Sequence, residues 1–324
     1  MKKAPTPERA KRHTQDHYTT VSTYGERLDA IREALLNAGI EPANMDALLS
    51  RLTDGQLIRT GTASKPSSKN LWLIAYHDSG LPFVVVAGDW ATGADMKWIA
   101  QTGDTMTDAE RRELQRRLAE AKQAREAEQA RQWEQAAARA AHHWHESTPA
   151  NPNHGYLQCK GIQPHNARQQ GSDLVLLLTD FNGKAWSLQT IDEVGNKRLM
   201  AGGRKAGNFI VVNRHDHPAH ILICEGFATG CTLAEIDGNA LVLAAIDCGN
   251  LKAVATGARN RWPDAEIVVC GDDDHQTEGN PGETAARAAA IAAGARYALP
   301  EWPDNAPLTL SDFNDLHQWQ KGAL

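Results

Sequence analysis

The chain has 324 residues, of which 41% are hydrophobic and 23% charged, and a formal net charge of -6. This length allows two domains with cores of ordinary size. No uninterrupted apolar run approaches the roughly 20 residues that span a bilayer, and the basic N-terminal stretch MKKAPTPERAKRH has no apolar segment behind it. We therefore expect a cytoplasmic protein without a membrane partner. The acidic balance argues against non-specific coating of nucleic acid.

The five cysteines are odd in number and form no CxxC pair, and three of them lie within or beside apolar runs. This pattern is typical of buried, reduced thiols. Histidines 142, 143 and 145 have no cysteine or acidic partners at ligand spacing, so we expect no zinc.

The N-terminal third changes its periodicity along the chain. Residues 1–20 are polar and are predicted to form a mobile arm. The apolar spacing then predicts two helices followed by two strands, over 24–38, 43–52, 70–78 and 81–90. The turn between the strands predicts a small antiparallel sheet, with Trp90 and Trp98 packed near it.

A long charged segment follows. Thr107 and Glu110 form a capping-box pattern that opens a stretch rich in Ala, Glu, Arg and Gln, running to about His145. Its mixed charges predict a solvated helix between two modules. Two interpretations of this helix remain open, a plain spacer or a nucleic-acid contact through Arg111, Arg112, Arg116 and Arg117.

A break rich in Pro, Asn and Gly at 147–155 precedes a predicted hairpin turning at Asn182-Gly183. The next strand is predicted to end near Met200. Between Val194 and His215 there are five basic residues and no acidic one, which would suit phosphate binding. These residues are Lys197, Arg198, Arg204, Lys205 and Arg214. The loop AGGRKAG places Arg204 and Lys205 among glycines, so the backbone could approach a ligand closely, although a solvated turn would look the same.

From residue 219 onward, apolar runs alternate with helical segments. The predicted strands are 220–225, 240–246, 266–271 and 296–299, with helices at 227–237, 250–260 and 283–294. This order predicts a parallel sheet covered on both faces, with ligands at the carboxyl ends of its strands. The acidic residues at these ends are Glu225, Asp247, Asp272 and Asp274, whereas Asp273 is expected to point away because alternate residues of an extended segment face opposite sides.

Carboxylates that end buried strands indicate a divalent-metal site, since a charge there needs water or a cation. Magnesium accepts a few carboxylate oxygens and keeps several waters. We therefore expect Mg²⁺, or Mn²⁺ in its place, held by Glu225, Asp272 and Asp274.

These residues also support a family resemblance. EGFATG after one strand, GDDD after another and DFNDL at 312–316 resemble the Toprim domain, the catalytic module shared by bacterial-type primases, topoisomerases and some nucleases. The resemblance implies that Glu225, with Asp272 and Asp274, forms the catalytic acidic set. It also makes Asp312 and Asp315 secondary candidates, for metal binding or for structure.

The resemblance extends upstream. YLQCKGI, GKAWSLQ and KRLMAGGRKAG resemble elements of the primase catalytic core, so the likeness covers roughly residues 150–320 and favours a primase of the plasmid or phage type. Such primases often begin with a cysteine-ligated zinc ribbon, but this chain has no cysteine before Cys159. No GxxxxGK[ST] motif is present, so the resemblance points to a separate replicative helicase as a partner.

We therefore expect an α/β fold with a Toprim-type parallel sheet flanked by helices, preceded by a mixed α+β primase subdomain and a small antiparallel-sheet N-terminal domain. The expected divisions are an N-terminal domain at 1–105, a linker helix at 106–147, the first part of the primase core at 148–218 and the Toprim domain at 219–324. The N-terminal domain would be a metal-free counterpart of the zinc ribbon that binds template or partner.

The expected function is synthesis of RNA primers on a single-stranded DNA template, from ribonucleoside triphosphates, by two-metal nucleotidyl transfer. Arg204 and Lys205 are candidates for nucleotide or template phosphate contacts, with Lys197 and Arg198 behind them and Lys160 as a lesser candidate. Two alternatives remain open, a Toprim nuclease that uses the same metals and a noncatalytic replication-accessory protein that binds DNA.

Overall fold

The computed structural model describes residues 15–20, 23–78, 80–90, 92–101 and 108–322. The chain separates into two compact units, Met1–Arg125 and Glu126–Leu324, each with its own hydrophobic core. The finer division expected at residues 105, 147 and 218 stays a prediction.

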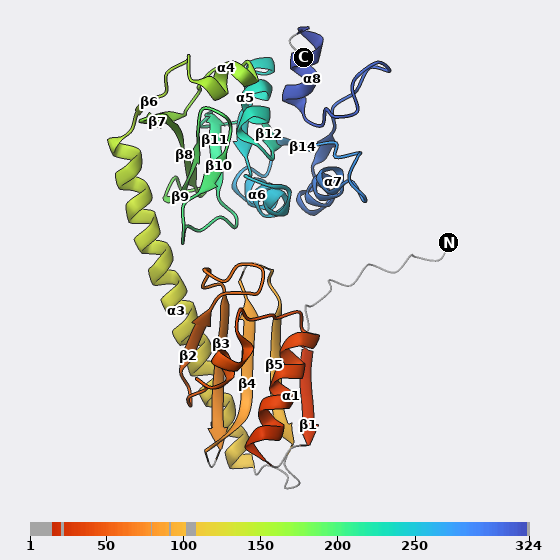
Figure 1. Cartoon of the computed structure of the whole chain (residues 1–324). Coiled ribbons are helices and arrows are strands. Elements are labelled where there is room, and N and C mark those ends of the chain that lie inside the picture. Colours follow the sequence, from red (N-terminus) through yellow and green to blue (C-terminus); the bar gives the residue numbers. More distant parts are fainter. Residues whose placement is uncertain (1–14, 21–22, 79, 91, 102–107, 323–324) are drawn as a thin grey trace. The chain divides into compact units, whose positions relative to one another are not determined.

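The first unit is a five-stranded sheet in the order β1-β5-β4-β3-β2. Its strands are β1 (Gln15–Thr20), β2 (Leu57–Thr60), β3 (Leu71–Asp78), β4 (Leu81–Asp89) and β5 (Asp95–Gln101). Alternate residues of β3, such as Leu71 and Leu73, are fully buried in one core with Ile31 and Leu35 of α1 (Tyr24–Asn37). A short helix, α2 (Met45–Leu49), adds to the same core. The predicted helices and strands of this region are confirmed (Figure 1).

The prediction of a mobile arm is wrong for Gln15–Thr20. These residues form β1, which pairs in parallel with β5 and makes an otherwise antiparallel sheet mixed. The pairing joins backbone groups about eighty residues apart in the chain, which local sequence patterns do not reveal. Residues 1–14 lie outside the described residues.

The two tryptophans expected near this sheet differ in their surroundings. Trp98 of β5 is completely buried in the core. Trp90 follows β4 with 42% of its surface exposed, and its ring centroid lies 6.2 Å from that of Trp72.

The long helix α3 spans Asp108–Glu146. The expectation of a solvated helix holds for only part of its last turns, because Ala136 and Ala140 are fully buried and Ala140 packs against Val175 and Leu188, whereas residues such as His142 and Glu146 are exposed. Alanines one turn apart let the helix approach the sheet closely. Thr107, and the side chains of Glu110, Arg111 and Arg117, lie outside the described part.

Within the described residues, none of the helices combines the length and apolar character needed to cross a membrane.

The second unit is built on a ten-stranded sheet with the main order β10-β9-β8-β11-β13-β12-β14-β15. Its central strands are β8 (Asp173–Thr179), β9 (Ala185–Ile191), β10 (Lys197–Leu199), β11 (Phe209–Asn213), β12 (His220–Cys224), β13 (Leu241–Ala244), β14 (Glu266–Cys270) and β15 (Arg296–Ala298). Two short strands, β6 (Thr148–Pro149) and β7 (Arg168–Gln170), attach beside β8. The hairpin predicted around Asn182-Gly183 is confirmed as β8 and β9.

The strands β13, β12, β14 and β15 are parallel, and helices cover both faces, as the sequence predicts. The helices of this unit are α4 (Gly155–Lys160), α5 (Phe227–Ile236), α6 (Cys248–Arg261), α7 (Pro281–Ala293) and α8 (Phe313–Gln320). One core contains Phe227 and Cys231 of α5, and the opposite core contains Leu251 of α6 and Ala289 of α7 (Figure 1).

One strand joins the two halves of this sheet. β11 pairs antiparallel with β8 on one side and with β13 on the other. The antiparallel hairpins and the parallel strands therefore form one continuous sheet. The glycine-rich basic segment connects β10 to β11, which lies beside the parallel strands.

Candidate active site

Acidic residues follow three neighbouring parallel strands at one edge of the sheet. Cys224, the last residue of β12, is in register with Cys270 of β14 and with Ala244 of β13. Glu225, Asp272 and Asp247 follow these positions by one, two and three residues. Buried aliphatic strands carry the chain to this edge, and the carboxylates begin where the strands end. The structure therefore brings these residues together.

The backbone is strained immediately before Asp247. Ile246 has φ 80, in the left-handed region that β-branched residues rarely occupy. Such a conformation costs about 1–3 kcal/mol and persists where surrounding packing enforces it. Asp247 is the N-cap of α6, yet its side chain makes no capping hydrogen bond. This carboxylate is thus available to other partners.

Burial and mutual repulsion perturb the acidic cluster. Burial, with the nearby charge of Asp274, raises the pKa of Glu225 to about 7, although the backbone N–H groups of Asp272 and Cys248 partly oppose this rise. The pKa of Asp272 rises to about 8, first through burial and then through the charges of Glu225, Asp312 and Asp274. The positively charged groups of the protein therefore do not compensate the negative charges of these carboxylates.

Three oxygens of the cluster fit a hard cation. Glu225 Oε1, Asp247 Oδ1 and Asp272 Oδ1 are buried and, in the described part of the chain, have no hydrogen-bond partner. Buried oxygens of this kind are costly unless they are paired. Among the described residues, no three side chains of His, Cys, Asp or Glu are already arranged around a metal position. The donor set nevertheless suits Mg²⁺, which takes carboxylate oxygens and completes its shell with water.

Asp274 is held by the N-terminus of α7. Its Oδ2 accepts a hydrogen bond of 3.1 Å from the backbone N of Gly282. A Cβ added at Gly282 would lie 2.4 Å from the carbonyl oxygen of Asp272 and 3.0 Å from Asp274 Oδ2. A glycine here lets α7 begin directly against the acidic loop.

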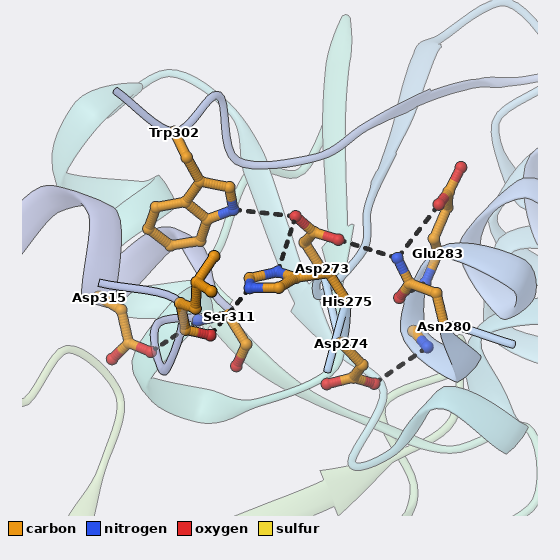
Figure 2. A network of polar contacts seen from close by, with 10 residues as sticks. Asp273, Asp274, His275, Asn280, Glu283, Trp302, Ser311 and Asp315 are labelled. Carbon is orange, nitrogen blue, oxygen red and sulfur yellow. Dashed lines mark hydrogen bonds and ion pairs between the residues drawn. The ribbon is translucent and has the colours of Figure 1, made fainter. Parts of the chain in front are cut away.

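The side chain of Asp273 points away from that of Asp274 and organises the loop (Figure 2). Its carboxylate accepts hydrogen bonds from Trp302 Nε1 at 2.9 Å and from Asn280 Nδ2 at 2.8 Å, and lies 3.2 Å from His275 Nδ1. His275 Nε2 lies 2.8 Å from the carbonyl oxygen of Leu308. These contacts fasten the loop that carries Asp272 and Asp274 to the segment before α8.

The DFNDL segment lies next to the cluster through Asp312. Asp312 caps α8, its Oδ1 accepting a hydrogen bond of 2.8 Å from Asp315 N, and burial together with the charge of Asp315 raises its pKa. The other carboxylate, Asp315, accepts a hydrogen bond from Ser311 N at 3.2 Å, and its Oδ1 lies 3.4 Å from Lys160 Nζ. The charge of Asp312 contributes to the raised pKa of Asp272, whereas Asp315 joins α8 to α4.

Of the basic residues predicted to contact phosphate, Lys205 and Lys197 interact with the acidic residues, whereas Arg198 and Arg204 have other neighbours. Lys205 Nζ forms an ion pair of 2.5 Å with Asp247, and the positive charge of Lys197 lowers the pKa of Asp272. Arg198 lies apart from them, exposed and 3.8 Å from Asp192. The guanidinium carbon of Arg204 lies 5.2 Å from the ring centroid of Trp133 and 4.9 Å from that of Trp186.

A cavity of about 270 Å³ lies between α4 and the turn that leads into β10. Lys160 and Lys197 both line it, together with Tyr156 and the turn at Glu193–Gly195. Two lysines from separate segments of the chain therefore line the same cavity.

The roles of Asp247 and Asn250 at the site became visible only in the structure. The sequence placed Asp247 on the acidic edge without a ligand role, although IDCGN follows the same strand, acid and glycine pattern as ICEGF. Asn250 is buried and holds the basic loop: its Nδ2 donates to Asn208 O at 2.8 Å and Ala245 O at 2.9 Å, and its Oδ1 accepts from Gly207 N at 2.8 Å. No pattern in the sequence signals that contact.

Parts of the chain are similar in sequence to known proteins. Residues 220–323 match the family model described as Toprim domain. Over 284 residues, or 84% of the chain, the sequence is 35% identical to a protein named DNA primase TraC from Escherichia coli. A second Escherichia coli protein of that name is 36% identical over 64% of the chain. The matches span only 26% and 15% of these two relatives, so the chain corresponds to a small part of each.

Solved structures show partial similarity. The primase fragment of the bacteriophage T7 primase-helicase protein has 15% identity and a TM-score of 0.39, over 54% of this chain and 75% of that one. The DnaG primase catalytic domain bound to ssDNA has 14% identity and a TM-score of 0.34, over 52% of this chain and 54% of that one. At this level of similarity, residue roles do not transfer.

Proposed function

We propose that this chain, whose residues 220–323 match the Toprim domain, is a DNA primase, which joins ribonucleoside triphosphates into RNA primers on single-stranded DNA. The observation that carries the proposal is the convergence of Glu225, Asp272 and Asp247 at one sheet edge, with three buried oxygens that have no hydrogen-bond partner among the described residues. Lysines stand directly beside these acids.

We assign Glu225, Asp272 and Asp274 to binding Mg²⁺ or Mn²⁺, with Asp247 and Asp312 close by. Divalent cations held there would neutralise the transferring phosphate and make the attacking 3′-hydroxyl a better nucleophile. A bond forms between that oxygen and the α-phosphorus while the bond to the β-phosphate breaks, and pyrophosphate leaves. With a pKa near 7, Glu225 could also accept the proton of the hydroxyl.

The lysines supply the complementary charge. Lys205 reaches the acidic edge from the glycine-rich loop, and Asn250 fixes the backbone of that loop. In the cavity between α4 and β10, Lys160 and Lys197 are suited to the phosphates of an incoming nucleotide, because an ammonium group is a mobile point charge with three donors.

The cellular setting is part of the proposal. We propose that the protein acts in the cytoplasm during plasmid or phage replication, together with a separate replicative helicase. The names of the two Escherichia coli relatives, both DNA primases, support a role in DNA replication.

A product assay tests the proposal. The chain would be incubated with ribonucleoside triphosphates, Mg²⁺ and defined single-stranded DNA templates, and the products separated by size. Dinucleotides and oligoribonucleotides are expected. Shortened DNA would instead reveal a Toprim nuclease, and binding without any product would indicate a replication-accessory protein.

A further inference from the structure

A second cavity, of about 200 Å³, lies beside the middle of β8. This strand pairs with β11 at residues 178–179 and with β7 at residues 173–175, and the cavity lies next to the stretch between these two pairings. Its lining residues include Trp144, Asn166, Leu177, Thr179, Val211 and Arg214. The last turns of α3, β8 and β11 therefore enclose one hollow, named here the β8–β11 cavity.

Arg214 lies at the end of β11 that is far from the acidic residues. Ile210 of β11 is in register with Ala244, after which the acidic residues begin, whereas Asn213 is in register with Val242 near the start of β13. The five residues of β11 span roughly 16 Å, because a strand rises about 3.3 Å per residue. A ligand bound at Arg214 would therefore leave the acidic site free.

The walls of the β8–β11 cavity suit a flat ring. Trp144, Leu177 and Val211 supply apolar surface. A cavity of about 150 Å³ holds a benzene ring, so a cavity of about 200 Å³ has room for a ring as large as a nucleobase. Thr179 and Asn166 add a hydroxyl and an amide, which can bond to the polar edge of such a ring. Apolar walls with a few polar groups are typical of small-molecule sites.

Two arginines give this region a positive charge. Arg214 is exposed and lines the cavity, and the guanidinium carbon of Arg168 lies 5.2 Å from the centroid of the Trp144 ring. Arg168 Nε is buried and, among the described residues, has no hydrogen-bond partner. Neither arginine forms an ion pair with a carboxylate of the described part of the chain. The planar N–H edge of arginine matches phosphate oxygens, so the charge suits a phosphate.

An extended peptide fits this cavity less well than a small ligand. The carbonyl oxygens of Val211 and Val212 accept hydrogen bonds of 3.1 and 3.2 Å from Asn166 Nδ2. A peptide that added a strand to the sheet would need such backbone groups as partners. A ligand that binds through a ring and a phosphate does not need them.

We propose that the β8–β11 cavity binds a nucleotide, at a site separate from the acidic edge where nucleotides are joined. The base lies against Trp144, Leu177 and Val211, within reach of the Thr179 hydroxyl. The phosphates contact Arg214, with Arg168 adding positive charge. The nucleotide bound here is not consumed, because the metal-binding carboxylates lie beyond the other end of β11.

Photolabelling locates the site without a catalytic readout. The whole chain would be irradiated with an azido-adenosine triphosphate probe in the presence of EDTA, which keeps metal from the acidic edge, and labelled peptides would be identified by mass spectrometry. Labelling is expected at the end of α3 or within residues 166–179, and excess ATP should prevent it. Labelling confined to the acidic edge or to the cavity of Lys160 and Lys197 would overturn the inference.

Arg214→Gln tests the phosphate contact, with Arg261→Gln as the matched control. Arg261 is also exposed and lies 5.5 Å from the Trp262 ring. Both changes would be made in a Lys197→Gln background, so that ATP bound between α4 and β10 does not mask the effect. By calorimetry in EDTA, Arg214→Gln should bind ATP about tenfold more weakly, because a charged hydrogen bond is lost. Equal ATP affinities of the two variants would contradict the assignment.

A series of ligands tests the contact with the base. Adenosine and tripolyphosphate should each bind the Lys197→Gln protein at least about tenfold more weakly than ATP, because each lacks one half of the ligand. Thr179→Val should weaken binding of ATP and leave binding of tripolyphosphate unchanged. Equal affinities for ATP and tripolyphosphate would show a site for anions alone and overturn the proposal. None of these measurements depends on primer synthesis, so this inference and the proposed function fail separately.

Discussion

Lys205 Nζ lies 2.5 Å from Asp247 Oδ2, so an ion pair ties the glycine-rich loop to the end of β13. The two side chains retain 38% and 44% of their exposure, and pairs this exposed contribute about 0–1 kcal/mol to stability. Both groups therefore remain accessible to a phosphate and a cation. The pair positions charges for a substrate more than it stabilises the fold.

A Lys205→Ala protein should accordingly melt within a few degrees of the unmodified chain while losing about tenfold or more in primer synthesis at low nucleotide concentration, since a bound phosphate loses a charged partner. Thermal melting and initial rates over a range of nucleotide concentrations would measure both effects. Lys252→Ala, on the exposed face of α6, is the control and should leave both unchanged. A large fall in melting temperature with normal synthesis would give Lys205 a structural role.

The stability of the metal-free protein should fall as pH rises. Folding raises the pKa of Glu225 to about 7 and of Asp272 to about 8, whereas carboxyl groups of an unfolded chain titrate near about 4. Between about pH 4 and pH 8 the folded state therefore binds more protons than the unfolded state, so stability is lost as pH rises through this window.

Melting temperatures from about pH 5 to about pH 8, with and without Mg²⁺, would measure this linkage. Saturating Mg²⁺ should flatten the profile, because the cation replaces the protons in the cluster. Asp272→Asn should make the metal-free profile shallower. A melting temperature that rises with pH across this range would show that the carboxylates are not destabilised by their burial.

Gly282→Ala should disturb the acidic loop without changing any charge. The new methyl group would lie 2.4 Å from the carbonyl oxygen of Asp272, so either α7 or the loop must move. We expect weaker Mg²⁺ binding and reduced synthesis, measured by the shift of melting temperature with added Mg²⁺. Gly238→Ala serves as control because its new Cβ meets nothing closer than 4.0 Å. Identical Mg²⁺ shifts in the two variants would argue against the tight packing.

Asp273→Asn should affect stability more than chemistry. The amide that replaces the carboxylate would present donors to Trp302 Nε1 or Asn280 Nδ2, and an unsatisfied buried group costs about 1–3 kcal/mol. The melting temperature should fall, whereas synthesis by the folded fraction should persist at a reduced rate. Asp272→Asn should show the reverse pattern. Complete loss of synthesis with an unchanged melting temperature would instead place Asp273 in the catalytic set.

The parallel half of the second unit was predictable because its pattern is local. Strands β12, β13 and β14 are short, largely buried apolar runs, and an acidic residue follows each of them within three positions. The right-handed crossover rule then places Glu225 and Asp272 at one edge. The pairing of β11 with β13 and of β1 with β5 was not predictable, because each depends on segments whose meeting no local pattern encodes.

Only part of the candidate site was predictable from the sequence. Acids at strand ends follow from the alternation of apolar runs, but the sequence gives no means of choosing which rings surround Arg204 or which polar group fixes the loop. Trp133 lies 71 positions before Arg204, and Asn250 lies 43 positions after Gly207. Contacts over such separations depend on the packing of α3 and α6 against the sheet.

Primer synthesis by a folded Asp272→Asn protein decides whether the carboxylate cluster is catalytic. On a single-stranded template with ribonucleoside triphosphates and Mg²⁺, the unmodified chain should make oligoribonucleotides and the variant should make none, with Glu225→Gln behaving alike. The variant should melt no lower than the metal-free parent, because an amide removes a buried charge. Undiminished oligoribonucleotide synthesis by the folded Asp272→Asn protein would contradict a metal-dependent active site at this edge of the sheet.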